Sequence, residues 1–285
     1  MRGHASPGSR LRVLGSLLVC WACNVPLAPV DCFTPAEKAA VAPTTGWASW
    51  EEVTIIAHRG LACCHPENTL EAIEASLAAG FNAIEVDVRT TRDGVPVLMH
   101  DETVDRTTNA VGAVEAMTFA AIRNADACPS LRDACIVPTV AEALAQVDGR
   151  ALILLDLKDT WGCSRFRAVA AAIDSAGAWQ DVALISSVVE TFDMARQLSP
   201  SVPLAYYWVG QPNGVADPVD YVARLGSAEL MLQAEVVTAG SEELKRATEA
   251  GLPVIVWTAR TSTRLRELWA TPGVKRVLSD VVPEG

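Results

Sequence analysis

The chain has 285 residues, half of them hydrophobic, which suits one large α/β domain or two small ones and supplies a sizeable core. Its formal net charge of −11 argues against a nucleic-acid partner, because nucleic acids require a basic surface. The sequence holds no internal repeat or heptad run, which disfavours a solenoid or a coiled coil. An acidic protein can still bind an anionic substrate where a metal ion or a few cations reverse the local field.

The first 28 residues resemble an export signal rather than part of a fold. Arginines near the start precede an apolar run from 13 to about 28, which is too short for a comfortable membrane span. We therefore predict a signal peptide over 1–28 and an exported protein, secreted or periplasmic. Lipid attachment at Cys23 is the alternative. Simple export is favoured because the residues before Cys23 lack the small-residue pattern that such processing prefers.

Cysteine usage agrees with export. The sequence has eight cysteines, and the six that follow the predicted signal make an even number in a compartment where disulfides persist. Cys128 and Cys135 bracket a short loop and are the best candidate pair. No Cys-x-x-Cys pair with a matching partner follows residue 28, so a zinc site is not expected. Free buried thiols are the alternative for any of the six.

After a tether at 29–50 with one short expected helix near 36–41, apolar runs alternate with helical patterns over 51–285. Most runs are continuously apolar, as in strands that are buried on both faces. The expected strands lie at 53–57, 83–88, 151–157, 182–186, 203–208, 229–233, 253–257 and 274–279. This alternation predicts a (β/α)8 barrel (TIM barrel), and an open doubly wound sheet is the alternative.

Helix signals stand between the expected strands. Asn68 or Thr69 can cap a helix that stops at Gly80. Further helices are expected at 164–177, 190–198, 241–251 and 262–270. After the last expected strand no room remains for a closing helix. We expect that the tether covers the gap or that the barrel is less shielded there.

One segment breaks the alternation. Residues 95–101 follow the second expected strand after only a few residues, which is too short for a parallel crossover. Asp93-Gly94 is a suitable turn. The segment is therefore expected to fold back as a hairpin arm.

Polar residues gather where the expected strands end, which is where such a barrel places reactive groups. They are His58, Arg59, Glu85, Asp87, His100, Asp156 and Lys158. Carboxylates that converge repel one another unless they share a cation, and oxygen ligands favour Mg²⁺ or Ca²⁺ over zinc. Each residue alone has a structural explanation, such as a core histidine or a buried ion pair. Their joint placement favours a catalytic site with a divalent metal ion.

A series of short motifs runs along the chain from residue 58. They are HRG at 58–60, PENT at 66–69, EVDVRTTRDGVPVLMHD at 85–101, DRTT at 105–108, PTVAEAL at 138–144, DLK at 156–158, Trp257-Thr258 and the terminal SDVVP. Together they resemble the glycerophosphodiester phosphodiesterase family. The resemblance covers about residue 53 to the end, and it assigns 102–150 to the small insertion that this family has after its second strand.

The resemblance implies a metal-dependent hydrolase that cleaves a small-molecule glycerophosphodiester to an alcohol and glycerol 3-phosphate. The acidic charge makes a nucleic-acid partner unexpected, and no stable protein partner is evident from the sequence. It also implies roles for single residues: Glu85, Asp87 and Asp156 as ligands of Ca²⁺ or Mg²⁺, His58 and His100 as general base and acid, Arg59, Lys158 and Trp257 as substrate-binding residues, and Glu67 and Asn68 as supporting residues. Histidine suits proton transfer because its pKa lies near working pH.

Two departures from the family's pattern matter. The family usually has Glu where this chain has Asp156, which predicts a metal ion drawn toward the third strand, bridged by water or bound more weakly. Cys63, Cys64 and His65 occupy a loop that usually holds small or polar residues. Because the loops after the first and third strands both border the loop of the second, we expect Cys63 or Cys64 to bond Cys163. His65 is expected to be a rim residue.

Two alternatives stand beside the phosphodiesterase hypothesis. A non-catalytic phosphodiester-binding barrel is supported by Asp156, but a binding protein has no need of both His58 and His100. A related barrel phospholipase that acts on phosphoinositides or sphingolipids is disfavoured by the PENT and HD motifs. The sequence also lacks an obvious apolar stripe or basic patch for membrane binding. Trp208 and Trp257 can line a glycerol pocket or serve as packing residues.

Overall fold

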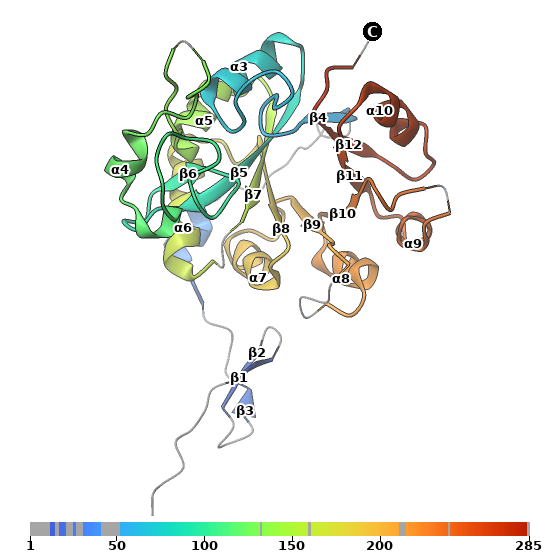
Figure 1. Ribbon diagram of the computed structural model, residues 1–285. Helices are drawn as coiled ribbons and strands as arrows, with labels where there is room; N and C mark the ends of the chain where they lie inside the picture. The colour runs from blue at the N-terminus through green and yellow to red at the C-terminus, as the bar shows by residue number, and fades with distance from the viewer. Residues whose placement is uncertain are drawn as a thin grey trace, which may run out of the picture.

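The structure is a computed structural model that describes residues 12–14, 17–20, 25–26, 31–40, 52–131, 133–158, 161–210, 215–238 and 240–283. Eight parallel strands form a closed barrel with helices around it (Figure 1). The strands are β4 (Ile55–Ala57), β5 (Ala83–Thr90), β7 (Leu152–Leu157), β8 (Val182–Ser186), β9 (Leu204–Tyr207), β10 (Ala228–Gln233), β11 (Val254–Ala259) and β12 (Arg276–Ser279). Because β4 pairs with both β12 and β5, the sheet is closed. The predicted barrel is confirmed and the open sheet is excluded.

The apolar runs form strands because both of their faces are buried. Along β7, Leu152 and Leu154 point into the cluster that fills the barrel, whereas Ile153 and Leu155 pack in the layer under the helices. Every residue of β7 and β8 is buried. Removing one such side chain, as in Leu154→Ala, typically costs about 2–5 kcal/mol. This two-sided core holds the strand ends, and therefore the site, in place.

The helices that surround the barrel are α3 (Leu70–Ala78), α5 (Val140–Val147), α6 (Cys163–Ser175), α7 (Val189–Leu198), α8 (Pro218–Leu225), α9 (Glu242–Glu249) and α10 (Ser262–Trp269). Thr69 caps α3 by accepting a hydrogen bond from the Ala72 amide, as its sequence position predicts. The expected helices at 164–177, 190–198, 241–251 and 262–270 are confirmed within one or two residues. The helices α5 and α8 were not predicted, although a capping box begins α5 and a capping Asp217 followed by proline begins α8.

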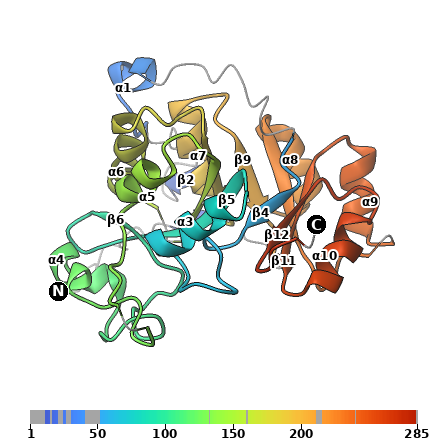
Figure 2. The ribbon, with the colours of Figure 1, turned by 90° about the horizontal axis from the view of Figure 1, so that it is seen from above.

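The hairpin arm is present as β6 (Pro96–Leu98), which pairs antiparallel with β5. An insertion follows it, with a 3-10 turn η1 (Val114–Ala116), a short helix α4 (Phe119–Arg123) and its own small apolar core. Figure 2 shows the insertion projecting beyond α3. Cys128 and Cys135 are bonded in it, with Cα atoms 5.1 Å apart, which confirms that predicted pair.

The described part of the predicted tether, 31–40, packs on the barrel. Its helix α1 (Pro35–Ala40) confirms the short helix expected there and contacts α7. The Phe33 ring meets Phe166 of α6 edge to face, with centroids 5.9 Å apart. In Figure 2 α1 lies on the side of α6, across the molecule from α10. The described residues of the tether therefore do not cover the end of the chain after β12.

The cysteine pairing differs from the expectation for Cys163. Cys163 bonds Cys32, with Cα atoms 5.1 Å apart, and Cys63 bonds its neighbour Cys64. The prediction that Cys63 or Cys64 bonds Cys163 is therefore wrong. The physical reason is the docking of the N-terminal segment, since packing of Phe33 on α6 brings Cys32 beside the first residue of that helix.

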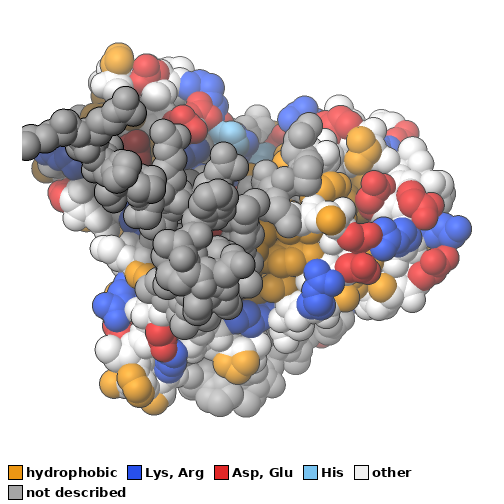
Figure 3. All heavy atoms as spheres, turned by 90° about the horizontal axis from the view of Figure 1, so that it is seen from below, with side chains coloured by type: hydrophobic (Ala, Val, Ile, Leu, Met, Phe, Trp, Pro, Cys, Tyr) orange, Lys and Arg blue, Asp and Glu red, His pale blue; other side chains and the backbone are white. Residues whose placement is uncertain are grey.

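Three short strands, β1 (Arg12–Leu14), β2 (Leu17–Cys20) and β3 (Val25–Pro26), form a separate antiparallel sheet. The rest of the predicted signal peptide, with Cys23, lies outside the described residues. Among the described residues, no helix has the length and apolar character that crossing a membrane requires. On the face in Figure 3, outside the grey atoms, Lys and Arg side chains are interspersed with Asp and Glu.

Candidate active site

Three buried carboxylates of the neighbouring strands β5 and β7 meet in one cluster. Glu85 and Asp87 stand two residues apart on one face of β5, and Asp87 lies directly opposite Asp156 in the register of the two strands. One carboxylate oxygen of each residue lies within 4.8 Å of the others. Asp156 therefore reaches the cluster although it is one methylene shorter than the Glu that the resemblance led us to expect.

Burial and mutual repulsion set the charge state of this cluster. Burial raises the pKa of Glu85 well above its ordinary value, and the charges of Asp87 and Asp156 raise it further. Burial also raises the pKa of Asp156. For Asp87, burial alone would raise the pKa, but Lys158 and Arg59 outweigh it and lower the pKa to about 2. Three carboxylates that repel one another in this way favour a cation between them.

The donor set fits a divalent ion that prefers oxygen. The Oδ1 atoms of Asp87 and Asp156 are buried and make no hydrogen bond, although Oδ1 of Asp87 lies 3.0 Å from Nζ of Lys158, outside hydrogen-bond geometry. A buried carboxylate oxygen without a donor is costly unless a cation approaches it. Three carboxylates supply the oxygen ligands that Mg²⁺ and Ca²⁺ take. Glu85, Asp87 and Asp156 could hold such an ion.

Two cations flank the carboxylates. Lys158 forms ion pairs with both Asp87 and Asp156. Arg59 donates its backbone N–H to Oε2 of Glu85 at 3.0 Å, and its Nε lies 3.3 Å from Oδ2 of Asp87. These groups place positive charge beside the cluster, which is what a phosphate anion needs in an acidic protein.

An unusual backbone places Arg59. Arg59 and Asn68 have positive φ values of 52° and 59°, a region that few residues other than glycine adopt. Gly60 has a φ of 81°, and a Cβ there would lie 2.6 Å from Cβ of Ala72. Nδ2 of the Asn68 side chain donates to Oδ2 of Asp87 at 2.7 Å, and its Oδ1 accepts from the backbone N–H of Asp87 at 2.9 Å. The HRG and PENT motifs thus form one turn that fixes Arg59 and Asp87 together.

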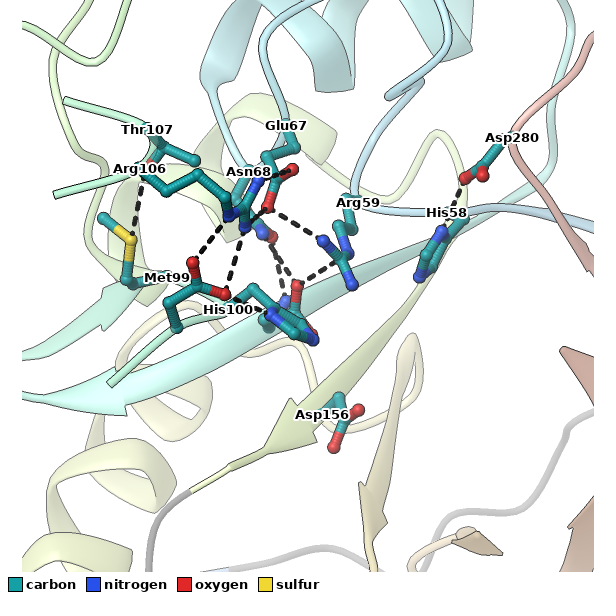
Figure 4. Close-up of polar contacts among 12 residues, drawn as sticks. His58, Arg59, Glu67, Asn68, Met99, His100, Arg106, Thr107, Asp156 and Asp280 are labelled. Carbon is teal, nitrogen blue, oxygen red and sulfur yellow. Dashed lines mark hydrogen bonds and ion pairs between the residues drawn. The ribbon is translucent and has the colours of Figure 1, made fainter. Parts of the chain in front are cut away.

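Each of the two histidines is held by a carboxylate, and Figure 4 shows Arg59 between them. Nδ1 of His58 lies 2.6 Å from Oδ1 of Asp280, and Nδ1 of His100 lies 2.7 Å from Oδ1 of Asp101. An ionised carboxylate only accepts hydrogen bonds, so each ring carries a proton on Nδ1. The other nitrogen, Nε2, is then available for proton transfer. Nε2 of His58 lies 3.9 Å from Oε2 of Glu85, at the edge of the cluster.

The remaining predicted residues lie around this centre. Oε1 of Glu67 accepts a hydrogen bond from Nη1 of Arg59 at 2.9 Å. Trp257, within β11, packs edge to face on Tyr207, with centroids 5.6 Å apart. His65 lines a surface groove beside Glu67, which agrees with its expected place on the rim.

Four residues to which the sequence analysis gave no role complete the site. Asp101 and Asp280 hold the histidines, and Arg106 donates to both Glu67 and Asp101. The Tyr207 ring lies 5.4 Å from Nζ of Lys158. The DRTT and SDVVP motifs contain Arg106 and Asp280, but only the folded chain shows what each contacts.

The comparisons with known proteins agree with this geometry. The sequence model of the Glycerophosphoryl diester phosphodiesterase family matches residues 58–282. The chain belongs to this family. Glycerophosphodiester phosphodiesterase 1 of Homo sapiens is 41% identical over 114 residues, which are 38% of this chain and 34% of that protein. The glycerophosphodiester phosphodiesterase of Bacillus altitudinis is 36% identical over 107 residues, which are 36% and 44% of the two chains. The matched part of the chain thus spans less than half the length of these two curated relatives.

Solved structures of the phosphodiesterase family share the fold. The putative glycerophosphoryl diester phosphodiesterase of Silicibacter pomeroyi superimposes with a TM-score of 0.71 at 26% identity, over 81% of this chain and 90% of that one. A phosphodiesterase of Oleispira antarctica, solved with the product sn-glycerol-3-phosphate, has a TM-score of 0.72 at 22% identity, over 82% and 96%. At 22% identity, the likeness to the Oleispira antarctica structure shows only that the two chains share a fold.

Proposed function

We propose that the protein is a metal-dependent phosphodiesterase that hydrolyses a glycerophosphodiester to an alcohol and glycerol 3-phosphate. The observation that carries the proposal is one site with three buried carboxylates, two cations and two carboxylate-held histidines. A binding barrel has no need of two proton-transfer groups. The names of the relatives and the product held by the Oleispira antarctica enzyme support the substrate class.

In this proposal, Glu85, Asp87 and Asp156 hold Ca²⁺ or Mg²⁺. When it is bound, the ion supplies positive charge that stabilises the phosphorane-like transition state. Lys158 and Arg59 bind phosphate oxygens from the two sides of the cluster. Their ion pairs with the carboxylates fix them before substrate arrives, so little reorganisation is needed during the reaction.

The acid–base pair follows from the hydrogen bonds to Nδ1. His58 accepts at Nε2 the proton of the substrate's own glycerol hydroxyl, whose oxygen bonds to phosphorus and forms a cyclic phosphate. Asp280 stabilises the imidazolium that forms. For its step, His100 carries a proton on Nε2 as well as on Nδ1; it gives the Nε2 proton to the leaving alcohol as the bond from phosphorus to that alcohol breaks, and Asp101 keeps the ring oriented. Water then opens the cyclic phosphate with the two histidines in exchanged roles.

The substrate's glycerol part has apolar surface available beside the phosphate site. The rings of Trp257 and Tyr207 meet edge to face near Lys158. In the proposal, Trp257 packs against the glycerol carbons. Glu67 and Asn68 support the site by holding Arg59 and Asp87, respectively.

We further propose that 1–28 is a signal peptide, 29–50 a tether and 51–285 the catalytic domain of an exported protein. Three disulfides among the described residues support export, because disulfides persist in oxidising compartments. Lipid attachment at Cys23 is the less favoured alternative.

The test is release of glycerol 3-phosphate from glycerophosphocholine and other glycerol diesters by the chain without its leader. It is run with Ca²⁺, with Mg²⁺ and with a chelator, beside His58→Ala and Asp156→Glu. The proposal requires metal-dependent release that disappears in His58→Ala. No release from any glycerol diester, together with activity gained in Asp156→Glu, would instead establish a binding barrel.

A further inference from the structure

Arg106 bridges the carboxylates of Glu67 and Asp101, which come from different loops of the site, and Figure 4 shows it beside Glu67. Its Nη1 and Nη2 donate to the two oxygens of Glu67 at 2.8 and 2.7 Å. Its Nε and Nη2 donate to the two oxygens of Asp101 at 2.6 and 3.1 Å. This use of the planar guanidinium fork on two carboxylates is a geometry that the ammonium of lysine cannot reproduce.

Each of these carboxylates holds a residue of the proposed reaction. Glu67 accepts from Nη1 of Arg59 at 2.9 Å, and Asp101 pairs with Nδ1 of His100 at 2.7 Å. Glu67 comes from the loop before α3, whereas Asp101 and Arg106 follow β6 in the insertion. The guanidinium therefore joins a phosphate-binding residue of one loop to an acid–base residue of another.

We propose that Arg106 is a positioning residue that holds Arg59 and His100 in a fixed relation through Glu67 and Asp101. The roles of Arg59 and His100 rest on the function proposed above. The hydrogen bonds from Arg106 to Glu67 and Asp101 do not depend on that function. The insertion thereby contributes to the site as well as projecting beside it.

Electrostatics agrees with this geometry. Hydrogen bonds from Arg106 are the main cause that lowers the pKa of Asp101 below its ordinary value, and the His100 ring adds to the effect. Burial raises the pKa of Glu67, but Arg106 and Arg59 outweigh it. Both carboxylates stay ionised and therefore remain acceptors for His100 and Arg59.

The chain contains a matched control for the simpler explanation that Arg106 only stabilises the insertion. Arg123 on α4 donates to both oxygens of Glu142 on α5, at 2.7 and 2.6 Å, and so also ties the insertion to the barrel. In the described part of the chain, Arg123 also lies over the Phe119 ring of α4, and neither Glu142 nor Phe119 belongs to the site. Arg106→Ala removes two two-oxygen ion pairs of the insertion and Arg123→Ala removes one, but only Arg106→Ala affects the carboxylates that contact Arg59 and His100.

Arg106 also permits chemical rescue. About half of its side chain is exposed (48%), and with Glu67 it lines a groove of about 390 Å³. In Arg106→Ala, a free guanidinium ion can enter from solvent and contact both carboxylates. A loss of structure would not be repaired in this way, whereas a loss of positioning would.

The experiment compares wild type, Arg106→Ala, Arg106→Lys and Arg123→Ala in kcat, KM and thermal midpoint, with and without guanidinium ion. We expect Arg106→Ala to lower kcat by about 10- to 100-fold, with a smaller change in KM, because misplaced catalytic groups cost this much. Arg106→Lys should recover part of the loss, and guanidinium should restore Arg106→Ala but not affect Arg123→Ala. A kcat of Arg106→Ala within about twofold of wild type, or an equal loss in Arg123→Ala, would overturn the inference.

A second measurement is independent of turnover. The ¹⁵N resonances of the ring nitrogens of His100 report the proton on Nδ1 and its hydrogen bond to Asp101. They should change in Arg106→Ala and stay as in wild type in Arg123→Ala. If wild type releases no glycerol 3-phosphate but this pattern is found, the proposed function fails and the positioning stands. Unchanged His100 resonances in Arg106→Ala would refute the positioning whatever the activity.

Discussion

Asp280 follows His58 by 222 residues in sequence, yet its Oδ1 atom lies 2.6 Å from Nδ1 of His58. The contact exists because β12 pairs with β4 and closes the barrel. In this pairing Ser279 lies opposite Ala57, and Asp280 and His58 are the next residues along the chain. Closure of the barrel therefore assembles the proposed acid–base group from the two ends of the domain. The last strand serves the chemistry as well as the fold.

Asp280→Asn is expected to lower kcat strongly with little effect on KM. The amide can donate to Nδ1, which favours the wrong tautomer, and it does not stabilise an imidazolium. General acid–base groups contribute about 10²–10⁴-fold, which sets the upper limit of the loss. The double variant with His58→Ala should be no worse than His58→Ala alone. Steady-state kinetics of Asp280→Asn, His58→Ala and the double variant tests this expectation. Additive losses would show that Asp280 acts independently of His58.

Divalent ions are expected to stabilise the protein against heat. At a concentration 100 times its dissociation constant, a ligand adds about 2.7 kcal/mol. For a domain of this size that corresponds to a rise in midpoint of about 5–10 °C. Scanning calorimetry with Ca²⁺, Mg²⁺ and chelator measures it. Asp156→Asn should abolish most of the rise, and an undiminished rise in this variant would mean that the ion binds elsewhere.

The chelated protein is expected to gain stability as pH falls from neutral toward 4.5, the ordinary pKa of glutamate. The folded state raises the pKa of Glu85 and Asp156, so in this range it binds more protons than the unfolded chain. Stability must then fall as pH rises. The sign reverses at lower pH, where carboxylates with lowered pKa values lose their interactions, Asp87 with its pKa of about 2 among them.

Denaturant unfolding of the chelated protein across this pH range measures the effect. Glu85→Gln should flatten the slope, because it removes a carboxyl group whose pKa the folded state raises. Added metal should also weaken the slope, because the ion competes with protons for the carboxylates. A stability that rises with pH in chelator would contradict the raised pKa of Glu85.

Local sequence signals predicted most of the fold because they act over a few residues. Continuous apolar runs gave strands such as β7, Asp93-Gly94 gave the hairpin, and Thr69 gave the start of α3. The two-residue spacing in Glu85 and Asp87 placed both carboxylates on one face. These features need no knowledge of distant contacts.

Contacts across long separations could not be predicted in the same way. Arg106 meets Glu67 across 39 residues, and Cys32 meets Cys163 across 131, through docking that no local pattern encodes. Six cysteines allow 15 pairings, so the connectivity had to come from the fold. Asp280, which orients His58 across 222 residues, was missed for the same reason.

Gly60→Ala is expected to reduce both stability and activity, because the added Cβ would lie 2.6 Å from Cβ of Ala72 at a φ of 81°. The strained backbone and the overlap each cost on the order of 1–3 kcal/mol. Gly80→Ala is the matched control, since Gly80 has a similar φ of 86° but no atom within 4 Å of the added Cβ. Relief of the overlap would move the turn that carries Arg59 and the N–H donor to Glu85. Denaturant unfolding should therefore show a larger loss for Gly60→Ala than for Gly80→Ala, and only Gly60→Ala should lose turnover at saturating substrate. Equal losses in the two variants would mean that backbone strain alone, and not the close approach of α3 to the turn, requires glycine at this position.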